Sequence, residues 1–166
     1  MLSVGQYDWI TGVRPEQVIQ LAVAAAPKSV QSVRFAARCG YIRTFQPKAQ
    51  KDWKRAIKLA VKEQLPVGWE PFSKVPLWVQ VTYVFPPLKS FRKGDMELIG
   101  NGGVIYKDTR PDVNDNLNKG LFDALTGVLW DDDGRVASSH VDKVYGQETG
   151  ILISVGVLPK GLKKGV

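Results

Sequence analysis

The sequence has few of the residues on which several classes of protein depend. Cys39 is the only cysteine, which excludes an intrachain disulfide and any zinc site built from cysteines. His140 is the only histidine and has no sequence neighbour that suggests catalysis, which favours a structural or surface role. There is no apolar run near the ~20 residues that span a bilayer, and no glycine-rich phosphate loop. We therefore expect an intracellular, cytoplasmic protein without a membrane segment.

The chain is instead rich in positive charge. Its formal net charge is +7 at pH 7, and its pI is about 9.5. Such a balance favours nucleic acid or another anionic surface as a partner. With 166 residues and a hydrophobic fraction of 44%, the chain is long and apolar enough to fold as one domain around its own core.

Hydrophobic periodicity predicts an α+β domain with a mixed or antiparallel sheet. Residues 1–27 form an expected N-terminal extension with one short helix that ends at Pro27, residues 28–158 the main domain, and residues 159–166 a basic tail. The elements expected in the domain are a hairpin over 29–45 that turns at Cys39-Gly40, a helix over 47–65, a strand over 77–85, a loop over 89–109, a helix over 115–127, and strands over 136–145 and 151–158.

Basic residues cluster in two of these expected elements. The hairpin carries Arg34, Arg38 and Arg43, and the loop, with the residue that follows it, carries Lys89, Arg92, Lys93, Lys107 and Arg110. Both sets are candidates for contacts with DNA phosphates, and a solvated surface is the alternative for each. The expected helix over 47–65 has one apolar face and many lysines elsewhere, and the same two interpretations apply to it.

An acidic stretch inside this basic chain gives the strongest indication of chemistry. Asp112 and Asp115 precede an amphipathic helical pattern, and Asp131, Asp132 and Asp133 follow it. Carboxylates that meet in space repel one another unless a cation lies between them. Carboxylate oxygens bind Mg²⁺ and Mn²⁺, which polarise phosphoryl groups and activate water. The stretch therefore predicts metal-dependent phosphodiester chemistry.

The same stretch suggests individual roles. Asp112, Asp115 and Asp133 are candidate metal ligands, and Lys119 is the candidate cation that stabilises charge on the leaving oxygen. At ~100° per residue, Asp115 and Lys119 lie about 40° apart on a helix, so both can face one site. The alternative is structural: Asp112 and Asp115 could form a capping box, and residues 131–134 a solvated turn. The same aspartates could serve both purposes.

The run from Asp115 to Val136 resembles the signature of the RusA-type Holliday junction resolvases. That pattern is Asp-x-Asp-Asn, then a lysine, an Asp-Ala-Leu helix end and a paired Asp-Asp. The matching residues here are Asp115-Asn116, Lys119, Asp123-Ala124-Leu125 and Asp132-Asp133. The resemblance extends from about residue 27 to residue 157, because the arginine hairpin, the lysine-rich helix and the Phe-Pro strand end also look like that family.

The resemblance implies a homodimer that binds four-way DNA junctions and cuts them symmetrically with Mg²⁺ or Mn²⁺. It implies that Asp115, Asp133 and Lys119 are essential, with Asp132 as a supporting carboxylate at the metal. It also implies branched DNA as the partner, and it is compatible with a phage or prophage origin.

One departure from the family pattern concerns Asp112. Asp112 and Asp115 are three positions apart where the family has a spacing of two, and on a strand this puts the side chains on opposite faces. Asp112 remains a candidate ligand if the extra residue forms a bulge, with Asn114 looped out, or if the chain is already turning into the helix.

We therefore expect a metal-dependent, structure-selective endodeoxyribonuclease that resolves four-way junctions by paired symmetric cuts. The rival hypothesis is a non-catalytic junction-binding dimer that keeps the fold but has lost its metal site through the insertion. A third is a basic structural protein that binds RNA or protein, in which the aspartates are only helix caps.

Overall fold

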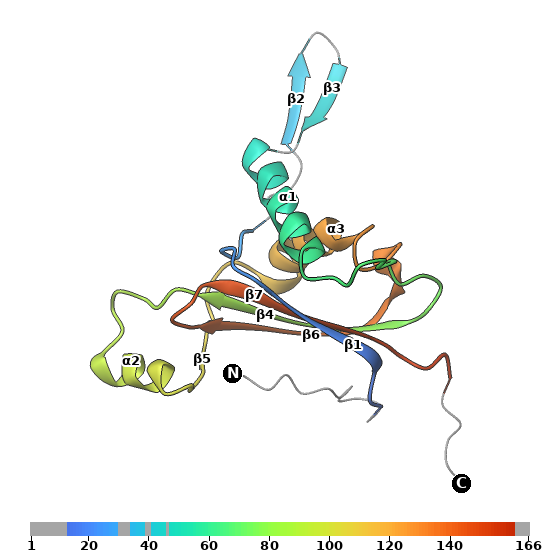
Figure 1. Cartoon of the computed structure of the whole chain (residues 1–166). Helices are drawn as coiled ribbons and strands as arrows, with labels where there is room; N and C mark the ends of the chain where they lie inside the picture. The colour runs from blue at the N-terminus through green and yellow to red at the C-terminus, as the bar shows by residue number, and fades with distance from the viewer. Residues whose placement is uncertain (1–12, 30–33, 39–40, 46, 162–166) are drawn as a thin grey trace.

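The central element of the structure is a five-stranded mixed sheet, against which helices pack. The computed structural model describes residues 13–29, 34–38, 41–45 and 47–161, and for residues 34–38, 41–45 and 115 it describes the backbone alone. The sheet has the order β1-β7-β4-β6-β5, and β2 and β3 form a separate hairpin (Figure 1). The strands are β1 (Glu16–Val23), β2 (Arg34–Arg38), β3 (Tyr41–Phe45), β4 (Leu77–Phe85), β5 (Ile105–Tyr106), β6 (Val136–Tyr145) and β7 (Gly150–Val157), and the α-helices are α1 (Lys48–Lys62), α2 (Lys93–Gly100) and α3 (Lys119–Leu125). The predicted α+β class is confirmed.

Strand β4 lies at the centre of the sheet, between β7 and β6, and most of its residues are buried on both faces. Leu77, Val79, Val81 and Tyr83 belong to the core that the sheet shares with α1 and α3, and Trp78 is buried on the opposite face. The strand pairs parallel with β6 and antiparallel with β7. The alternation in the sequence described the first face only, because polar residues on the opposite face masked the burial of Trp78 there.

The N-terminal segment is a strand, so the short helix predicted within residues 1–27 is wrong. Residues 16–23 form β1, which pairs antiparallel with β7 at one edge of the sheet. Leu21 and Val23 are both buried, which is the period of two that a strand requires. Pairing with β7 outweighs the helical preference of the alanines, because strand formation depends on the surrounding sheet more than on local propensity.

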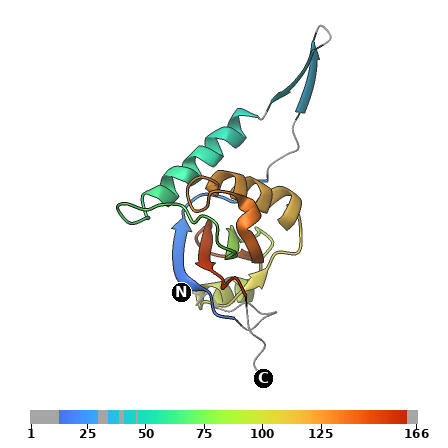
Figure 2. The same ribbon diagram turned by 90° about the vertical axis from the view of Figure 1, so that its right-hand side faces the viewer.

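Helix α1 and the β2–β3 hairpin form an arm on one side of the sheet (Figures 1 and 2). Both elements were predicted and are confirmed, although the turn at Cys39-Gly40 lies outside the described residues. Ile57 and Val61 are the buried apolar side of α1. Lys54 Nζ lies 2.8 Å from Asp123 Oδ2 in α3. This ion pair joins the two helices, so Lys54 is engaged within the protein.

The loop predicted over residues 89–109 contains two regular elements. Helix α2 begins after Arg92, whose N–H donates to Asp95 Oδ2 at 2.9 Å, and β5 pairs with the end of β6. The glycines around Gly102 obscured both elements in the sequence, and the φ of 80° at Gly102 ends the helical run. None of the helices in the described ranges combines the length and apolar character needed to cross a bilayer.

Candidate active site

The first group of predicted site residues lies where the chain turns from β5 into a helix. Asp112 precedes a π-helical turn, Val113–Asn118, which continues directly into α3. The Leu117 N–H donates to the Asp112 carbonyl at 3.2 Å, and this i→i−5 bond is one residue wider than that of an α-helix. The wider turn accommodates the extra residue before Asp115. Asn114 is therefore part of the helix and is not looped out.

The Asp112 carboxylate is exposed and makes no capping bond to the helix that it precedes. Instead, Asn116 Nδ2 donates to Asp112 Oδ2 at 3.5 Å. This geometry disfavours the capping alternative for Asp112. An open cleft of about 550 Å³ lies here, and its described lining residues are Ser29, Arg110, Pro111, Asp112 and Asn116.

Lys119 is exposed at the start of α3, on the same helical run as Asp112. The backbone of Asp115 lies between them within the π-helical turn, and its side chain is outside the described part of the structure. The first motif thus presents one exposed carboxylate and one exposed ammonium at the head of the helix.

A buried hydrogen bond anchors the π-helical turn to the sheet. The Tyr83 hydroxyl on β4 donates to Asn118 Oδ1 at 2.9 Å, and both residues are buried. Burial raises the pKa of Tyr83 well above its usual range, so the hydroxyl keeps its proton and remains a donor. Neither residue belongs to a motif that marks it as functional in the sequence.

Replacement of Tyr83 by Phe is expected to lower the free energy of unfolding by ~1–3 kcal/mol, because Asn118 Oδ1 is left buried without its donor. Urea denaturation of Tyr83→Phe beside the parent protein measures this loss. A Tyr83→Phe/Asn118→Leu protein lacks both polar groups and is expected to recover part of it. Equal stability of Tyr83→Phe and parent would contradict the role of this bond.

Lys143 of β6 holds the backbone that leads into Asp112. Its Nζ donates to the carbonyls of Thr109 and Pro111, at 2.8 and 2.9 Å. Because Pro111 is the residue before Asp112, the ammonium fixes where the first motif begins. Lys143 interrupts the apolar alternation of Val141 and Tyr145, and this was the signal in the sequence that could have identified it.

The second group of predicted site residues lies between α3 and β6. Asp132 Oδ1 accepts from the Gly134 N–H at 2.8 Å and so begins a 3₁₀ turn, Asp133–Arg135. This supports the turn interpretation for Asp132, whose second carboxylate oxygen accepts no hydrogen bond from the described residues. Asp133 is exposed, and its carboxylate makes no hydrogen bond within the described part of the chain. The turn therefore offers Asp133 as a ligand.

Asp131 has a structural role beside this turn. Its carboxylate accepts from Ser73 Oγ at 2.7 Å and from Arg135 Nε at 3.2 Å. The hydrogen bonds from Ser73 and Arg135 hold the pKa of Asp131 below its usual range. Asp131 thereby attaches the turn to the loop that follows α1.

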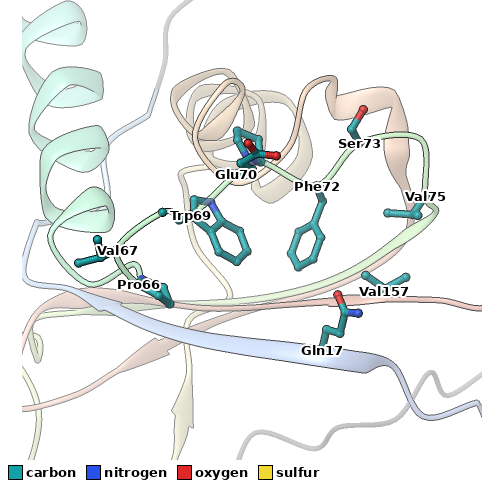
Figure 3. A pocket seen from close by; sticks show the side chains of 11 residues that line it. Gln17, Pro66, Val67, Trp69, Glu70, Phe72, Ser73, Val75 and Val157 are labelled. Atoms are coloured by element: carbon teal, nitrogen blue, oxygen red, sulfur yellow. The ribbon is translucent and has the colours of Figure 1, made fainter.

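A second cleft, of about 490 Å³, lies where that loop passes over β1 and β7 (Figure 3). The rings of Trp69 and Phe72 lie side by side across from Gln17 and Val157, with centroids 5.1 Å apart in an edge-to-face contact. The Phe72 carbonyl accepts from the Asp131 N–H at 3.0 Å. Glu70 is the one carboxylate among the described residues that line this mainly apolar cleft, so these residues do not form a metal site.

The two motifs lie at opposite ends of β6. Asp112 follows Pro111, which is bonded to Lys143, whereas Asp133 precedes Val136, where the strand begins. The stretch of strand between these ends spans about 20 Å at ~3.3 Å per residue, whereas ligands of one Mg²⁺ lie ~2.1 Å from the ion. Among the described residues, no three acidic, histidine or cysteine side chains could hold a metal. One chain does not bring Asp112 and Asp133 to one ion.

The basic residues predicted to contact DNA are in different parts of the molecule. Arg110 lies in the cleft with Asp112, while Lys89, Arg92 and Lys93 are exposed around the start of α2, at the far end of the molecule from the hairpin (Figure 1). The side chains of Arg34, Arg38 and Arg43 in the hairpin are outside the described part of the structure.

Lys107 differs from the expectation of a DNA contact. Its ammonium donates to the Thr109 hydroxyl and, at 3.3 Å, to the Tyr145 hydroxyl, and it lies 5.3 Å from the ring centroids of Phe85 and Tyr145. These contacts leave Lys107 half-buried. It serves the packing of β5 on β6.

Fold and site together define an α+β protein with an Asp-Asn-Lys helix and an Asp-Asp turn at opposite ends of one strand of a mixed sheet. The family model for the endodeoxyribonuclease RusA matches residues 25–156. The chain belongs to the RusA endodeoxyribonuclease family, as the resemblance predicted. A relative in Bacillus subtilis (strain 168), the uncharacterized protein YqaN, is 26% identical over 138 residues, which is 82% of this chain and 94% of the relative.

Proposed function

We propose that the protein is a metal-dependent endodeoxyribonuclease that acts as a homodimer and resolves four-way DNA junctions in the cytoplasm. Membership of the RusA family supports the class of reaction. The observation that carries the proposal is the Asp112 carboxylate, which is exposed in a cleft beside Arg110 and makes no capping bond. An exposed carboxylate that does not cap its helix and shares a cleft with an arginine is suited to a cation and a phosphate.

The donor set fits Mg²⁺ or Mn²⁺, because Asp112, Asp115 and Asp133 offer hard carboxylate oxygens. Either ion supplies a Lewis acid that polarises a phosphoryl oxygen and lowers the pKa of a bound water. Asp132 supports Asp133 through the turn that it caps. Lys119, exposed at the head of α3, stabilises the negative charge that develops on the leaving oxygen.

The distance between the motifs favours an active site built from two chains. Asp112 and Asp115 come from one copy and Asp133, with Asp132, from the other. A homodimer then contains two such sites related by a two-fold axis, and paired sites are what paired symmetric cuts require. The homodimer is thus part of the chemistry in this proposal, since the described residues of one copy do not bring Asp112 and Asp133 to one ion.

The proposal is tested by cleavage of a mobile four-way junction beside a matched linear duplex, with Mg²⁺, with Mn²⁺ and with EDTA. Paired cuts in the junction alone, lost in EDTA, are the expected result. Basic side chains that contact phosphates also predict a steep decrease in junction affinity with added salt. Tight junction binding without cuts under either metal would replace this proposal with the non-catalytic junction-binding dimer.

A further inference from the structure

The outer edge of β6 is open over most of its length. The inner edge pairs with β4 along the whole strand. On the outer side, β5 pairs only with Val144 and Tyr145, and the Lys107 N–H donates to the Lys143 carbonyl at 2.8 Å. No strand of the described chain pairs with the outer edge over residues 136–142. An unpaired edge of this length is a template for another strand.

The opposite edge of the sheet, β1, is protected against such pairing. The Gln64 side chain occupies it, because Gln64 Oε1 accepts from the Ala22 N–H at 3.0 Å and Gln64 Nε2 donates to the Ala22 carbonyl at 2.9 Å. The register of β1 is also irregular between Glu16 and Ile19, where Gln17 has a φ of 50°. Irregular and covered edges resist strand addition. The two edges of the five-stranded sheet therefore differ, and in the described part of the chain β6 is the edge that is left available.

The open run of β6 is suited to antiparallel pairing with itself. The Lys143 carbonyl faces outward, toward Lys107, so the main-chain groups of Val141 and Ser139, two and four residues earlier, face outward as well. The 3₁₀ turn Asp133–Arg135 limits the run at one end and β5 limits it at the other. A two-fold axis at the middle of the run, Ser139, places each half of one strand opposite the other half of its copy.

This pairing brings the two motifs together. With Ser139 on the axis, Val136 of one copy lies opposite Asp142 of the second copy, about 5 Å away across the strand pair, and Lys143 of the second copy follows directly. That lysine holds the carbonyl of Pro111, the residue before Asp112. Asp133 of one chain and Asp112 of the other thereby meet at each end of the paired strands, whereas within one chain they are about 20 Å apart.

We infer that the outer edge of β6, over residues 136–142, is the surface through which a second copy of this chain binds, in an antiparallel pair centred on Ser139. This inference rests on the proposed function, because the proposed metal site takes its ligands from two copies of the chain. The dimer formed in this way has one continuous ten-stranded sheet, with a complete proposed metal site at either end of the two paired β6 strands.

The arrangement also places the two arms, each formed by α1 and the β2–β3 hairpin, on the same side of the dimer. The two-fold axis of an in-plane strand pair is perpendicular to the sheet, so both copies present the same face on the same side. Helices α1 and α3 and the β2–β3 hairpin all lie on one side of the sheet (Figures 1 and 2). Both active sites and both arms then face one bound junction.

Disulfide trapping of the full chain tests the interface directly. In a Cys39→Ser background, Ser139→Cys places two thiols in one hydrogen-bonded antiparallel pair, with Cα atoms ~5.5 Å apart, within the range that a disulfide spans. Mild oxidation without DNA or metal is expected to convert most of this protein to a disulfide-linked dimer on a non-reducing gel. Ser139 is exposed, so the substitution spares the core.

The matched control is Gln20→Cys in the same background, an exposed residue on the protected edge strand β1, which is expected to stay monomeric on the gel. Cross-linking of Ser139→Cys no faster than that of Gln20→Cys would overturn the inference. Because the gel is read without substrate, it is independent of nuclease activity: a rapid cross-link in a protein that never cuts would support the interface and contradict the proposed function.

Discussion

Cleavage of a four-way junction by an Asp133→Asn protein is expected to fall at least ~100-fold, while the affinity for the junction stays within about two-fold. The amide keeps the shape of the side chain but removes the charge that a cation requires. The Asp133 carboxylate makes no hydrogen bond in the described part of the chain, so the substitution leaves the fold intact. Single-turnover cleavage and a gel-shift titration in Ca²⁺ measure the two quantities.

The control for that loss is Asp108→Asn, which removes one negative charge from an exposed residue close to the first motif. It is expected to cut at the rate of the parent protein. A parallel loss of binding and cleavage in Asp133→Asn would show that Asp133 supports the structure or the DNA contact, and it would remove Asp133 from the proposed metal site.

Cleavage is expected to return when two inactive proteins, Asp112→Asn and Asp133→Asn, are mixed and allowed to exchange subunits. In a mixed dimer, one site receives both substitutions and the other receives neither. With random exchange, about a quarter of the wild-type number of sites is restored, and the products are nicks instead of paired cuts. If each site were built within one chain, no combination would contain an intact site.

The control mixture combines Asp112→Asn with Asp115→Asn. Both changes fall in the first motif, so each site of the mixed dimer keeps one substitution and no cleavage is expected. Subunit exchange is verified by native mass spectrometry of the same samples. Verified mixed dimers of Asp112→Asn and Asp133→Asn that do not cut would exclude a site shared between two chains.

Much of the fold was predictable because its elements have strong local signals. Residues 77–85 alternate toward the core, and α1 follows a proline with a regular apolar stripe, so both could be located from pattern alone. The strand at residues 16–23 could not be, because alanines and a preceding proline also suit a helix. Its conformation depends on pairing with β7, about 130 residues later in the chain.

The candidate site residues could be chosen from the sequence, but their arrangement in space could not. The acidic stretch suggested Asp112, and the family motif suggested Asp133 and Lys119, but sequence proximity suggested that the aspartates meet within one chain. The path of α3 and the parallel pairing of β4 with β6 separate them instead. Tyr83 and Lys143 were missed because their partners are a side chain and two carbonyls more than thirty residues away.

The π-helical turn at Val113–Asn118 has a consequence for how such motifs are recognised and how they evolve. The additional residue is taken up as extra width of one turn, and that turn places Leu117 in the core and Asn118 within reach of Tyr83. A helix that can widen by one residue has a tolerance for insertion that a strand with strict alternation lacks. Two chains whose aspartates differ in spacing can therefore present the same active surface. The spacing of the two aspartates depends on the width of one backbone turn. One additional residue between them therefore does not exclude a chain from having this motif.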